Sequence, residues 1–362
     1  MNIRKLILSG SMTAVQPISV STHGADKQDA CIVYMPIVVG ENHQVVPVIT
    51  GQNIKGRLRR DATRAVIEAT PEKDRKLLSL DAQYLMRVGG VKSNDRETPA
   101  NLKKIAQLRQ RNPLLSLMGA GDPWVWGRLQ VSNAVPAAGN YQIAEFNNMR
   151  LDDFKQRPDL LSELSPEDVE QFVRYTDAAR ERSLDDKEAK DLKVELGRLK
   201  KGPESDEKSA REAEIRELLS AHDARKKGRK SKKKDDDNAG EARPSVAQLL
   251  TVRGIAQGTE LFHTMTVMTP AALEIGLLFA ALDEISMMPT IGGKTNVGFG
   301  RVKARYDIVL FETGNKKTIA GEIRLEENDF TVDSDHPFVT GALEAWKAEA
   351  ANLDVSRYVK GY

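Results

Sequence analysis

The sequence predicts an α+β fold in which a ferredoxin-like (RRM-like) βαββαβ core carries a large charged, partly helical insertion. Two strong helical patterns and the strand-like segments around them support the core. Their order is strand, helix, strand, then strand, helix, strand, which is that of a ferredoxin-like fold. The insertion is indicated by a change of composition, because residues 151–243 are rich in Lys, Arg, Asp and Glu and poor in aromatic residues.

The six core elements lie on both sides of the insertion. In chain order they are Ile3–Ser9, Asn53–Ala69, Val125–Val131, Glu260–Met268, Ala271–Met288 and Arg301–Phe311. The two helices have the clearest patterns, whereas the strand at Val125 rests on alternate residues sharing one face. The expected domains are a first part of the core in residues 1–145, the insertion in 146–245, a second part of the core in 246–315 and a C-terminal extension in 316–362.

The composition indicates an intracellular protein. The chain has 362 residues and one cysteine, Cys31, and its start lacks the basic and apolar segments of a signal peptide. The most apolar stretch, Ala271–Met288, is interrupted by acidic residues and is shorter than the roughly 20 apolar residues of a membrane helix. We therefore expect a cytoplasmic protein with no disulfide and no membrane partner. Because the net charge is only +2, a nucleic-acid site must come from local clusters of Lys and Arg.

The insertion contains a basic run. Leu184–Leu199 is expected to be helical, whereas Lys226–Lys234 and the following Asp235–Asp237 are expected to be disordered. The run is either a solvated loop or an arm that contacts nucleic acid, and like charges alone do not decide between the two. We expect the segment from about Lys200 to Asp237 to be mobile and dispensable for folding, since it has little apolar surface to offset the entropy of ordering.

The first helix combines a buried stripe with many cations. The apolar residues at helical spacing are Ile54, Leu58, Ala62, Ala65 and Ala69. Lys55 and Arg59 fall together on one flank of this stripe. The cations on the far side are Arg57, Arg60 and Arg64.

The start of this helix has the features of a phosphate site. Thr50–Asn53 offers capping side chains and amide N–H groups without helical partners, and Gly51 lets a ligand approach the backbone. Lys and Arg follow directly, which favours an anion there. The alternative is a solvated basic face paired with Asp61 and Glu68, and this segment alone leaves both interpretations open.

A glycine-rich loop leads into the last core strand. Its glycines are Gly292, Gly293, Gly298 and Gly300. It is not a P-loop, because Met288 stands at the first glycine position and a strand follows instead of a helix. It is not a dinucleotide fingerprint either, because Lys303 stands at the third glycine position. The glycines indicate either a backbone that comes close to a ligand or another chain, or a plain connection.

Neither a metal nor a cofactor is expected. The histidines, which have no partners at metal spacing, are His23, His43, His222, His263 and His336. His23, Asp26 and Asp29 form an acid–base cluster in a polar loop, and most such clusters are simply loops. Trp124 and Trp126 share a strand face and are expected to pack in the sheet or an interface, with stacking on bases as the alternative.

Four segments together resemble the RAMP (repeat-associated mysterious protein) superfamily. Val48–Arg59 (VITGQNIKGRLR) looks like the family segment IPGSSLKGxLR, and Gly292–Val302 resembles its GGxxxxGFGRV loop. Leu117–Ala134 and Ile255–Phe262 are similar, in the same order, to its LFG…GRLxVSDA and VPAGTEF strands. The resemblance covers most of residues 1–145 and 250–312.

The resemblance implies a backbone subunit of a CRISPR effector complex, most similar to the type IV subunit and next to that of type III. Such a subunit binds the CRISPR guide RNA, stacks head to tail with copies of itself as a filament, joins other effector subunits, and presents the guide to complementary target DNA or RNA. The RNA-binding residues implied here are Gln52, Asn53, Lys55, Arg57, Arg59, Arg60, Gly292, Gly293, Lys294 and Arg301. The family's thumb hairpin has no clear motif, and Tyr84–Pro99, with Gly89 and Gly90 at its turn, is the candidate.

The resemblance also bears on catalysis. In RNA-cutting relatives the loop before the first helix resembles GxVDxPI, and its Asp supports cleavage. The matching stretch is Cys31–Ile37, in which Tyr34 stands in place of that Asp, and Asp26 and Asp29 are the nearest carboxylates. Tyrosine is ordinarily neutral at pH 7 and replaces a carboxylate poorly. We expect a protein that is not an enzyme; the alternatives are an endoribonuclease that cuts target or guide RNA, and a general single-strand-binding protein.

Overall fold

The computed structural model of the chain describes residues 3–20, 32–39, 42–90, 102–121, 124–137, 139–149, 158–199, 206–232, 249–314 and 316–359. The chain divides into two compact units. One contains Met1–Phe146 and Thr251–Tyr362, and the other contains Asn147–Leu250. In the described ranges, no helix is both long enough and apolar enough to cross a membrane.

The first unit is built on an antiparallel sheet in the order β13-β12-β11-β1-β10-β6, with β7 also paired to β10. Its strands are β1 (Ile3–Ala14), β6 (Leu129–Val131), β7 (Val135–Pro136), β10 (Glu260–Met268), β11 (Val302–Glu312), β12 (Lys317–Glu326) and β13 (Asp329–Asp333). The core also contains the helices α1 (Gly51–Ala69) and α8 (Ala272–Ser286). Its elements follow one another along the chain in the order β1-α1-β6-β10-α8-β11. The central order β11-β1-β10-β6 is the ferredoxin-like arrangement, so the predicted fold class is confirmed.

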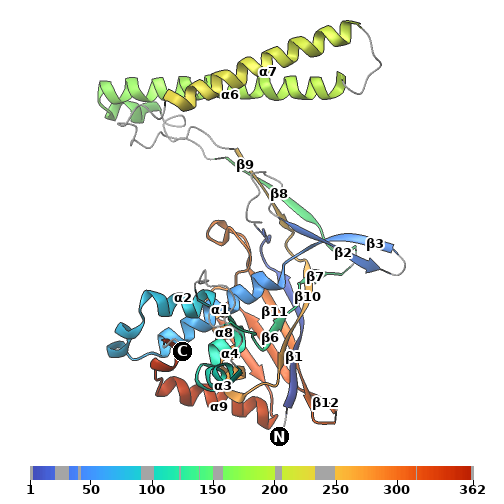
Figure 1. Ribbon diagram of the computed structural model, residues 1–362, viewed down its shortest axis with the longest axis vertical. Helices are drawn as coiled ribbons and strands as arrows, with labels where there is room; N and C mark the ends of the chain where they lie inside the picture. The colour runs from blue at the N-terminus through green and yellow to red at the C-terminus, as the bar shows by residue number, and fades with distance from the viewer. Residues whose placement is uncertain are drawn as a thin grey trace. The chain divides into compact units, whose positions relative to one another are not determined.

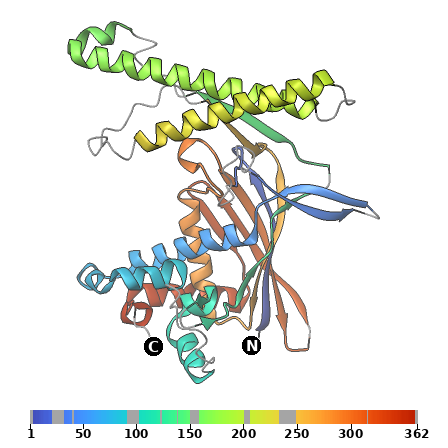
Figure 2. The same ribbon diagram turned by 45° about the horizontal axis from the view of Figure 1, so that its top comes forward.

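One face of the sheet is covered by α1 and α8 (Figures 1 and 2). Alternate residues of β1 point into the core, and Leu8 lies opposite Met265 of β10 and Ile308 of β11. Helix α8 is buried over most of its surface because α1 packs on one side of it and α9 (Pro337–Ala351) on another. This explains why its sequence is apolar on nearly every side.

The predicted strand Val125–Val131 is wrong as a single element. Its first part belongs to β5 (Trp124–Val125), which pairs with β4 (Ala120–Gly121), and its last part is β6, which pairs with β10. Between them, a Cβ atom on Gly127 would lie 2.5 Å from the carbonyl carbon of Met118. The chain therefore passes too close to the end of the preceding helix to continue as a regular strand.

Three helices form a small layer beside α1. They are α2 (Leu80–Val88), α3 (Leu102–Arg111) and α4 (Pro113–Met118), and α2 is preceded by the 3₁₀ turn η1 (Glu72–Leu77). A second apolar cluster joins this layer to β4 and β5; its buried members are Leu85, Leu108, Leu115, Ala120 and Val125. Through Ala120 and Val125, this cluster holds β4 and β5 beside the N-terminal half of α1.

The C-terminal residues extend the core. Strands β12 and β13 lengthen the sheet beyond β11, and α9 packs on α8. The short α10 (Ser356–Val359) follows, and its Tyr358 side chain is completely buried. The predicted C-terminal extension thus contributes two strands and part of the core, as far as residue 359.

A two-stranded ribbon precedes α1. Strand β2 (Val33–Val39) pairs antiparallel with β3 (Asn42–Val48), and Ile49, just after β3, bridges to Ala134. A second ribbon pairs β8 (Ile143–Met149) with β9 (Leu249–Ile255).

The second unit consists mainly of two long helices that lie side by side (Figure 1). They are α6 (Pro166–Leu199) and α7 (Asp206–Lys232), preceded by the 3₁₀ turn η2 (Pro158–Glu163), and Arg211 Nε of α7 lies 2.9 Å from Glu195 Oε1 of α6. The expected lack of order from about Lys200 is therefore wrong for Asp206–Lys232. Its Ala, Glu, Lys and Arg residues are good helix formers, and ion pairs one turn apart support the helix. The side chains of Lys226–Lys234 and all of Asp235–Asp237 lie outside the described residues.

Candidate nucleic-acid interface

A groove beside the N-terminal half of α1 gathers four cations. Its walls come from α1, from the C-terminal end of α2 and from residues 118–121 and 125–127. The lining residues are Gln52, Lys55, Gly56, Arg59, Arg60, Arg87, Val88, Gly89, Met118, Gly119, Ala120, Gly121, Val125, Trp126 and Gly127. None of these described lining residues is a carboxylate, so their combined positive charge suits an anion.

Lys55 lies in the wall that α1 shares with β6. Its Nζ donates a hydrogen bond to the carbonyl oxygen of Leu129 at 2.7 Å. Burial lowers the pKa of Lys55, and the positive charge of Arg59 lowers it further. An ammonium group has three N–H donors, and Leu129 takes one of them. Lys55 is thus a desolvated cation that a bound anion would stabilise.

Arg59 joins three parts of the groove. Its side chain is only 9% exposed and donates hydrogen bonds to the carbonyl oxygens of Met86, at 3.4 Å, and of Gly119. Burial lowers its pKa to about 10. Arg59 therefore holds α2 and the α4–β4 turn against α1, and it also contributes positive charge to the groove wall.

The groove cations have no carboxylate partners within the described part of the chain: no ion pair there involves Lys55, Arg59, Arg60 or Arg87. Cations just outside the groove are paired. Arg64 lies 3.5 Å from Asp61 and 4.0 Å from Glu284, and Arg128 lies 3.0 Å from Glu274. A buried or half-buried cation without a counter-charge is costly, so the groove is preorganised for an anion that the described residues do not supply.

The start of α1 differs from the predicted phosphate site. The backbone N–H of Gly51 donates to Asn133 Oδ1 at 2.9 Å, and that of Asn53 donates to Thr50 Oγ1 at 3.3 Å. A Cβ atom on residue 51 would lie 2.1 Å from the carbonyl oxygen of Val131. The glycine is therefore required by the close approach of β6 and not by a ligand, and side chains already cap these amides.

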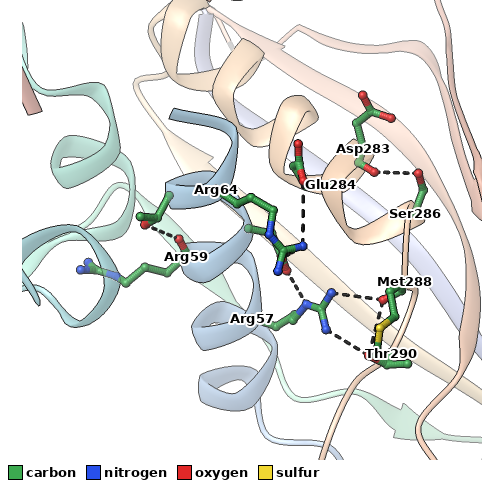
Figure 3. A network of polar contacts seen from close by, with 10 residues as sticks. Arg57, Arg59, Arg64, Asp283, Glu284, Ser286, Met288 and Thr290 are labelled. Atoms are coloured by element: carbon green, nitrogen blue, oxygen red, sulfur yellow. Dashed lines mark hydrogen bonds and ion pairs between the residues drawn. The ribbon is translucent and has the colours of Figure 1, made fainter. Parts of the chain in front are cut away.

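Arg57 points away from the groove. In Figure 3, Arg57 and Arg59 leave α1 in opposite directions. Arg57 bonds to Asp61 in its own helix, to Thr290 Oγ1 at 3.0 Å and to the carbonyl oxygen of Met288 at 3.1 Å. Its contacts hold the turn after α8.

The glycine-rich loop packs on its own chain. The N–H groups of Gly293 and Gly300 donate to the carbonyl oxygens of Ser19 and Pro17, at 2.7 and 2.8 Å. The partner that comes close to these glycines is therefore the segment of the same chain that follows β1.

The loop residues predicted to bind RNA do not line the groove. Arg301 lies 2.8 Å from Glu327, and Lys294 has a left-handed backbone, with φ of 59°, at the start of the turn η3 (Thr295–Val297). The structure thus brings Gln52, Lys55, Arg59 and Arg60 together in the groove. The predicted residues outside it are Asn53, Arg57, Gly292, Gly293, Lys294 and Arg301.

Two of the groove residues that were not among the predicted RNA contacts have long polar or aromatic side chains, Arg87 and Trp126. Arg87 lies in the last turn of α2, inside the segment considered only as a possible thumb. Trp126 was expected to pack, but its side chain is 72% exposed, so packing in the sheet is wrong for this residue. The side chain of Trp124 lies outside the described residues. Exposure depends on tertiary contacts, so the local sequence could not place Arg87 in the groove, and for Trp126 it left packing and stacking on bases as alternatives.

The structure also bears on the predicted thumb, on Tyr34 and on the predicted acid–base cluster. Tyr84–Val88 is helical and ends at Gly89 with φ of 87°, so this part of the proposed thumb is not a hairpin; residues 91–99 lie outside the described ranges. Tyr34 is on β2, opposite Pro47, and is half exposed. His23, Asp26 and Asp29 lie outside the described residues. Across the described ranges, no group of three or more His, Cys, Asp or Glu is suited to a metal ion.

Comparisons with known proteins place the groove within a family match. A family model described as RAMP superfamily matches residues 35–303, a range that includes every groove residue. No curated protein sequence matches the chain.

Three solved structures are similar to the chain. The crystal structure of Csc2 from Thermofilum pendens has 10% identity and a TM-score of 0.36, with 98% of this chain and 88% of that chain covered. A chain of a type IV-B CRISPR complex has 14% identity and a TM-score of 0.39, with coverage of 87% and 93%. A chain of the type III-B Cmr-β complex bound to cognate target RNA has 10% identity and a TM-score of 0.36, with coverage of 84% and 61%.

Proposed function

Since the chain belongs to the RAMP superfamily, we propose that it is a guide-RNA-binding backbone subunit of a CRISPR effector complex and that the groove beside α1 holds the RNA phosphates. The observation that carries this proposal is the set of four groove cations without a carboxylate partner among the described residues. The sequence resemblance described above supports the same function.

The electrostatics favour a phosphate backbone over other anions. Lys55 and Arg59 are close enough for the charge of one to lower the pKa of the other, and both are desolvated. A single phosphate between them would offset both costs. Arg60 and Arg87 are exposed along the same groove, where further phosphates of an extended strand can reach them.

The division of α1 into two sides refines the RNA contacts implied by the resemblance. We assign Lys55, Arg59, Arg60 and Arg87, with Gln52, to RNA, and we assign Arg57 to the support of the turn after α8. Contacts to phosphate carry no sequence information. This suits a protein whose guide is read by base pairing and not by side chains.

The proposal also covers assembly and catalysis. Copies of the chain stack head to tail along the guide, as in the type IV or type III complexes that the motifs resemble. The subunit presents the guide for pairing without cutting the target, because Tyr34 occupies the position of the family carboxylate.

The salt dependence of RNA binding tests the groove. The variant Lys55→Gln/Arg60→Gln/Arg87→Gln should bind single-stranded RNA more weakly, and its plot of log affinity against log salt should be flatter by about 2, at roughly 0.7 for each lost phosphate contact. A control with the same net charge is Lys73→Gln/Lys317→Gln/Lys347→Gln, whose three lysines are exposed and outside the groove. Equal slopes for both variants would contradict the assignment.

A further inference from the structure

Gly56 lies inside α1, although the packing of the described residues does not require a glycine there. Among the described residues, the atom nearest to a Cβ atom placed on Gly56 would be Arg60 Nη1, at 3.8 Å, which is an ordinary contact distance. By contrast, a Cβ atom on Gly276 of α8 would lie 2.2 Å from the carbonyl oxygen of Ala342, so packing requires that glycine. The surroundings of α1 therefore leave room for a side chain at position 56.

A glycine inside a helix lowers stability. Glycine loses more conformational freedom on folding than alanine does, and in a helix this lowers the folding equilibrium constant by about 2- to 5-fold. At position 56, α1 thus carries a costly residue that its packing does not explain. Such a residue is expected where a group from outside the fold has to come close to the helix backbone.

Gly56 lies on the groove side of α1. Residues three and four positions apart are neighbours on a helix surface, so Gly56 has Gln52 on one side and Arg59 and Arg60 on the other. All four residues line the groove. The missing side chain leaves a gap in this wall between Gln52 and Arg60, which we call the Gly56 notch. The guanidinium group of Arg60 lies beside the notch.

The charges around the notch identify the ligand chemistry. An anionic oxygen in the space of the missing side chain would lie next to Arg60 Nη1, from which it can accept a charge-assisted hydrogen bond. Lys55, Arg59 and Arg87 line the same groove, so further charges of a polyanion also meet cations. A nucleic-acid strand carries such charges at regular intervals along its backbone.

We propose that the Gly56 notch seats one phosphate of the RNA strand directly against α1, beside Arg60. This inference rests on the proposed function and deepens it, because it names the point where the strand comes closest to the helix. A side chain at position 56 would hold the strand away from α1 while every groove cation stays in place. Binding then depends on a close fit as well as on charge, and this distinguishes the notch from a general attraction to polyanions.

Substitutions at position 56 obstruct the notch without changing the charge of the protein. Full-length wild-type protein, Gly56→Ala and Gly56→Leu are titrated with a fluorescein-labelled uridine oligonucleotide over a range of salt concentrations. Gly56→Leu should lose about 10- to 150-fold in affinity, which is the worth of a hydrogen bond to a charged group. Its plot of log affinity against log salt should be flatter by about 0.7, because one phosphate contact is lost although no cation is removed. Gly56→Ala is a smaller obstruction and should lose part of this affinity.

Stability is the second readout, and Gly341 provides a matched control. Gly341 lies in α9 outside the groove, and in the described part of the chain no atom comes within 4 Å of a Cβ atom placed on it. In urea denaturation, Gly56→Ala and Gly341→Ala should both lower the unfolding equilibrium constant by about 2- to 5-fold. Gly341→Ala and Gly341→Leu should retain the wild-type RNA affinity and salt slope.

The outcomes separate the notch from the proposed function. Wild-type affinity and salt slope in Gly56→Leu, or in Gly56→Ala if the leucine variant does not fold, would overturn the inference and leave the proposed function intact. A Gly56→Ala variant less stable than wild type would show that the fold requires the glycine, which would also overturn it. So would binding of a poly-glutamate peptide that is lost in Gly56→Leu while oligonucleotide binding is retained, because the notch would then hold an acidic protein segment. Wild-type protein without affinity for the oligonucleotide would instead contradict the proposed function itself.

Discussion

Arg57 donates a hydrogen bond from Nη1 to the hydroxyl of Thr290 at 3.0 Å, and this contact ties α1 to the turn after α8. The same guanidinium group bonds to Asp61, whose side chain is 2% exposed. Arg57 lies two residues before Arg59, yet the two side chains serve opposite sides of α1 (Figure 3). The cations of this helix thus divide into a structural set and a groove set.

The first prediction follows from this division. Arg57→Gln should lower the free energy of unfolding by about 2–3 kcal/mol, because among the described residues it leaves the buried carboxylate of Asp61 with the more distant Arg64 alone as a partner. The salt slope of RNA binding should not change. Urea denaturation and RNA titrations measure the two effects. As a control, Arg64→Gln should cost less than about 1 kcal/mol, since Arg64 is half exposed. An intact fold with a flatter salt slope in Arg57→Gln would contradict the structural assignment.

A second prediction concerns the acidic residues between α1 and α8. Burial, followed by a hydrogen bond with Glu68, raises the pKa of Glu284 to about 7; the charge of Glu68 and that of Asp283 also raise it, whereas Arg64 lowers it. In the unfolded chain the carboxyl titrates near 4.5. The folded state therefore binds more protons between about pH 4.5 and 7, and stability contributed by the protonated form is lost as pH rises through that window.

Glu284→Gln should remove this pH dependence. Its melting temperature should exceed that of wild type at pH 8, and the difference should shrink as the pH is lowered toward 4.5, where wild-type Glu284 is also neutral in the folded state. Thermal unfolding at a series of pH values measures it. Asp335→Asn is a suitable control, because that residue lies outside this cluster. A variant that is less stable than wild type at pH 8 would show that the negative charge of Glu284 is needed.

The third prediction is that the assembled complex binds complementary RNA without cutting it. Tyr34 lies on β2, and the sequence resemblance matches it to the carboxylate of the RNA-cutting relatives. A tyrosine replaces a carboxylate poorly in accepting a proton or binding a metal. Guide-loaded complex, labelled complementary RNA and Mg²⁺ should give no ladder of evenly spaced products. A ladder that disappears in Asp26→Ala or Asp29→Ala would move the protein to the ribonuclease class.

The fourth prediction concerns the helical unit. Since Asn147–Leu250 is a separate compact unit, replacing residues 158–232 by a Gly/Ser linker should leave the first unit folded, with cooperative thermal unfolding close to that of wild type. Insolubility or a large fall in melting temperature would contradict it. RNA titration of the same variant also decides between the two interpretations of the basic run. A solvated run leaves the salt slope unchanged, whereas an RNA-contacting arm flattens it.

Elements with a complete local pattern could be predicted from the sequence. Glu260–Met268 alternates over its whole length and matches β10, and the apolar period of α1 gives its buried stripe. The prediction of one strand over Val125–Val131 was wrong because its alternate apolar residues pack in two separate clusters. Val125 packs in the small cluster with Leu115, whereas Leu129 packs in the main core. Local alternation cannot show that a chain turns between two cores.

The groove was predicted only in part. The spacing of Lys55 and Arg59 placed them on a common flank, and the structure confirms that they share the groove wall. The prediction that Arg60 lies on the far side with Arg57 and Arg64 is wrong, because Arg60 also lines the groove. The burial of Arg59, the outward ring of Trp126 and the arrival of Arg87 all depend on how α2 and α4 pack beside α1. These contacts join residues far apart in the chain, so sequence spacing carries no information about them. A glycine is needed wherever another group comes close to the backbone, whether that group is a ligand or a neighbouring strand. The sequence therefore could not show that Gly51 makes room for β6.

The RNA that the protein carries in its host tests the central claim most directly. Wild-type protein and the variant Lys55→Gln/Arg60→Gln/Arg87→Gln are purified from a host that carries the CRISPR array, and the RNA that survives a high-salt wash is sequenced. The account predicts array-derived guide RNA on the wild-type protein and its loss from the variant, while the Lys73→Gln/Lys317→Gln/Lys347→Gln control retains it. Wild-type protein without array-derived RNA, or a groove variant that carries as much of it as wild type, would contradict the account.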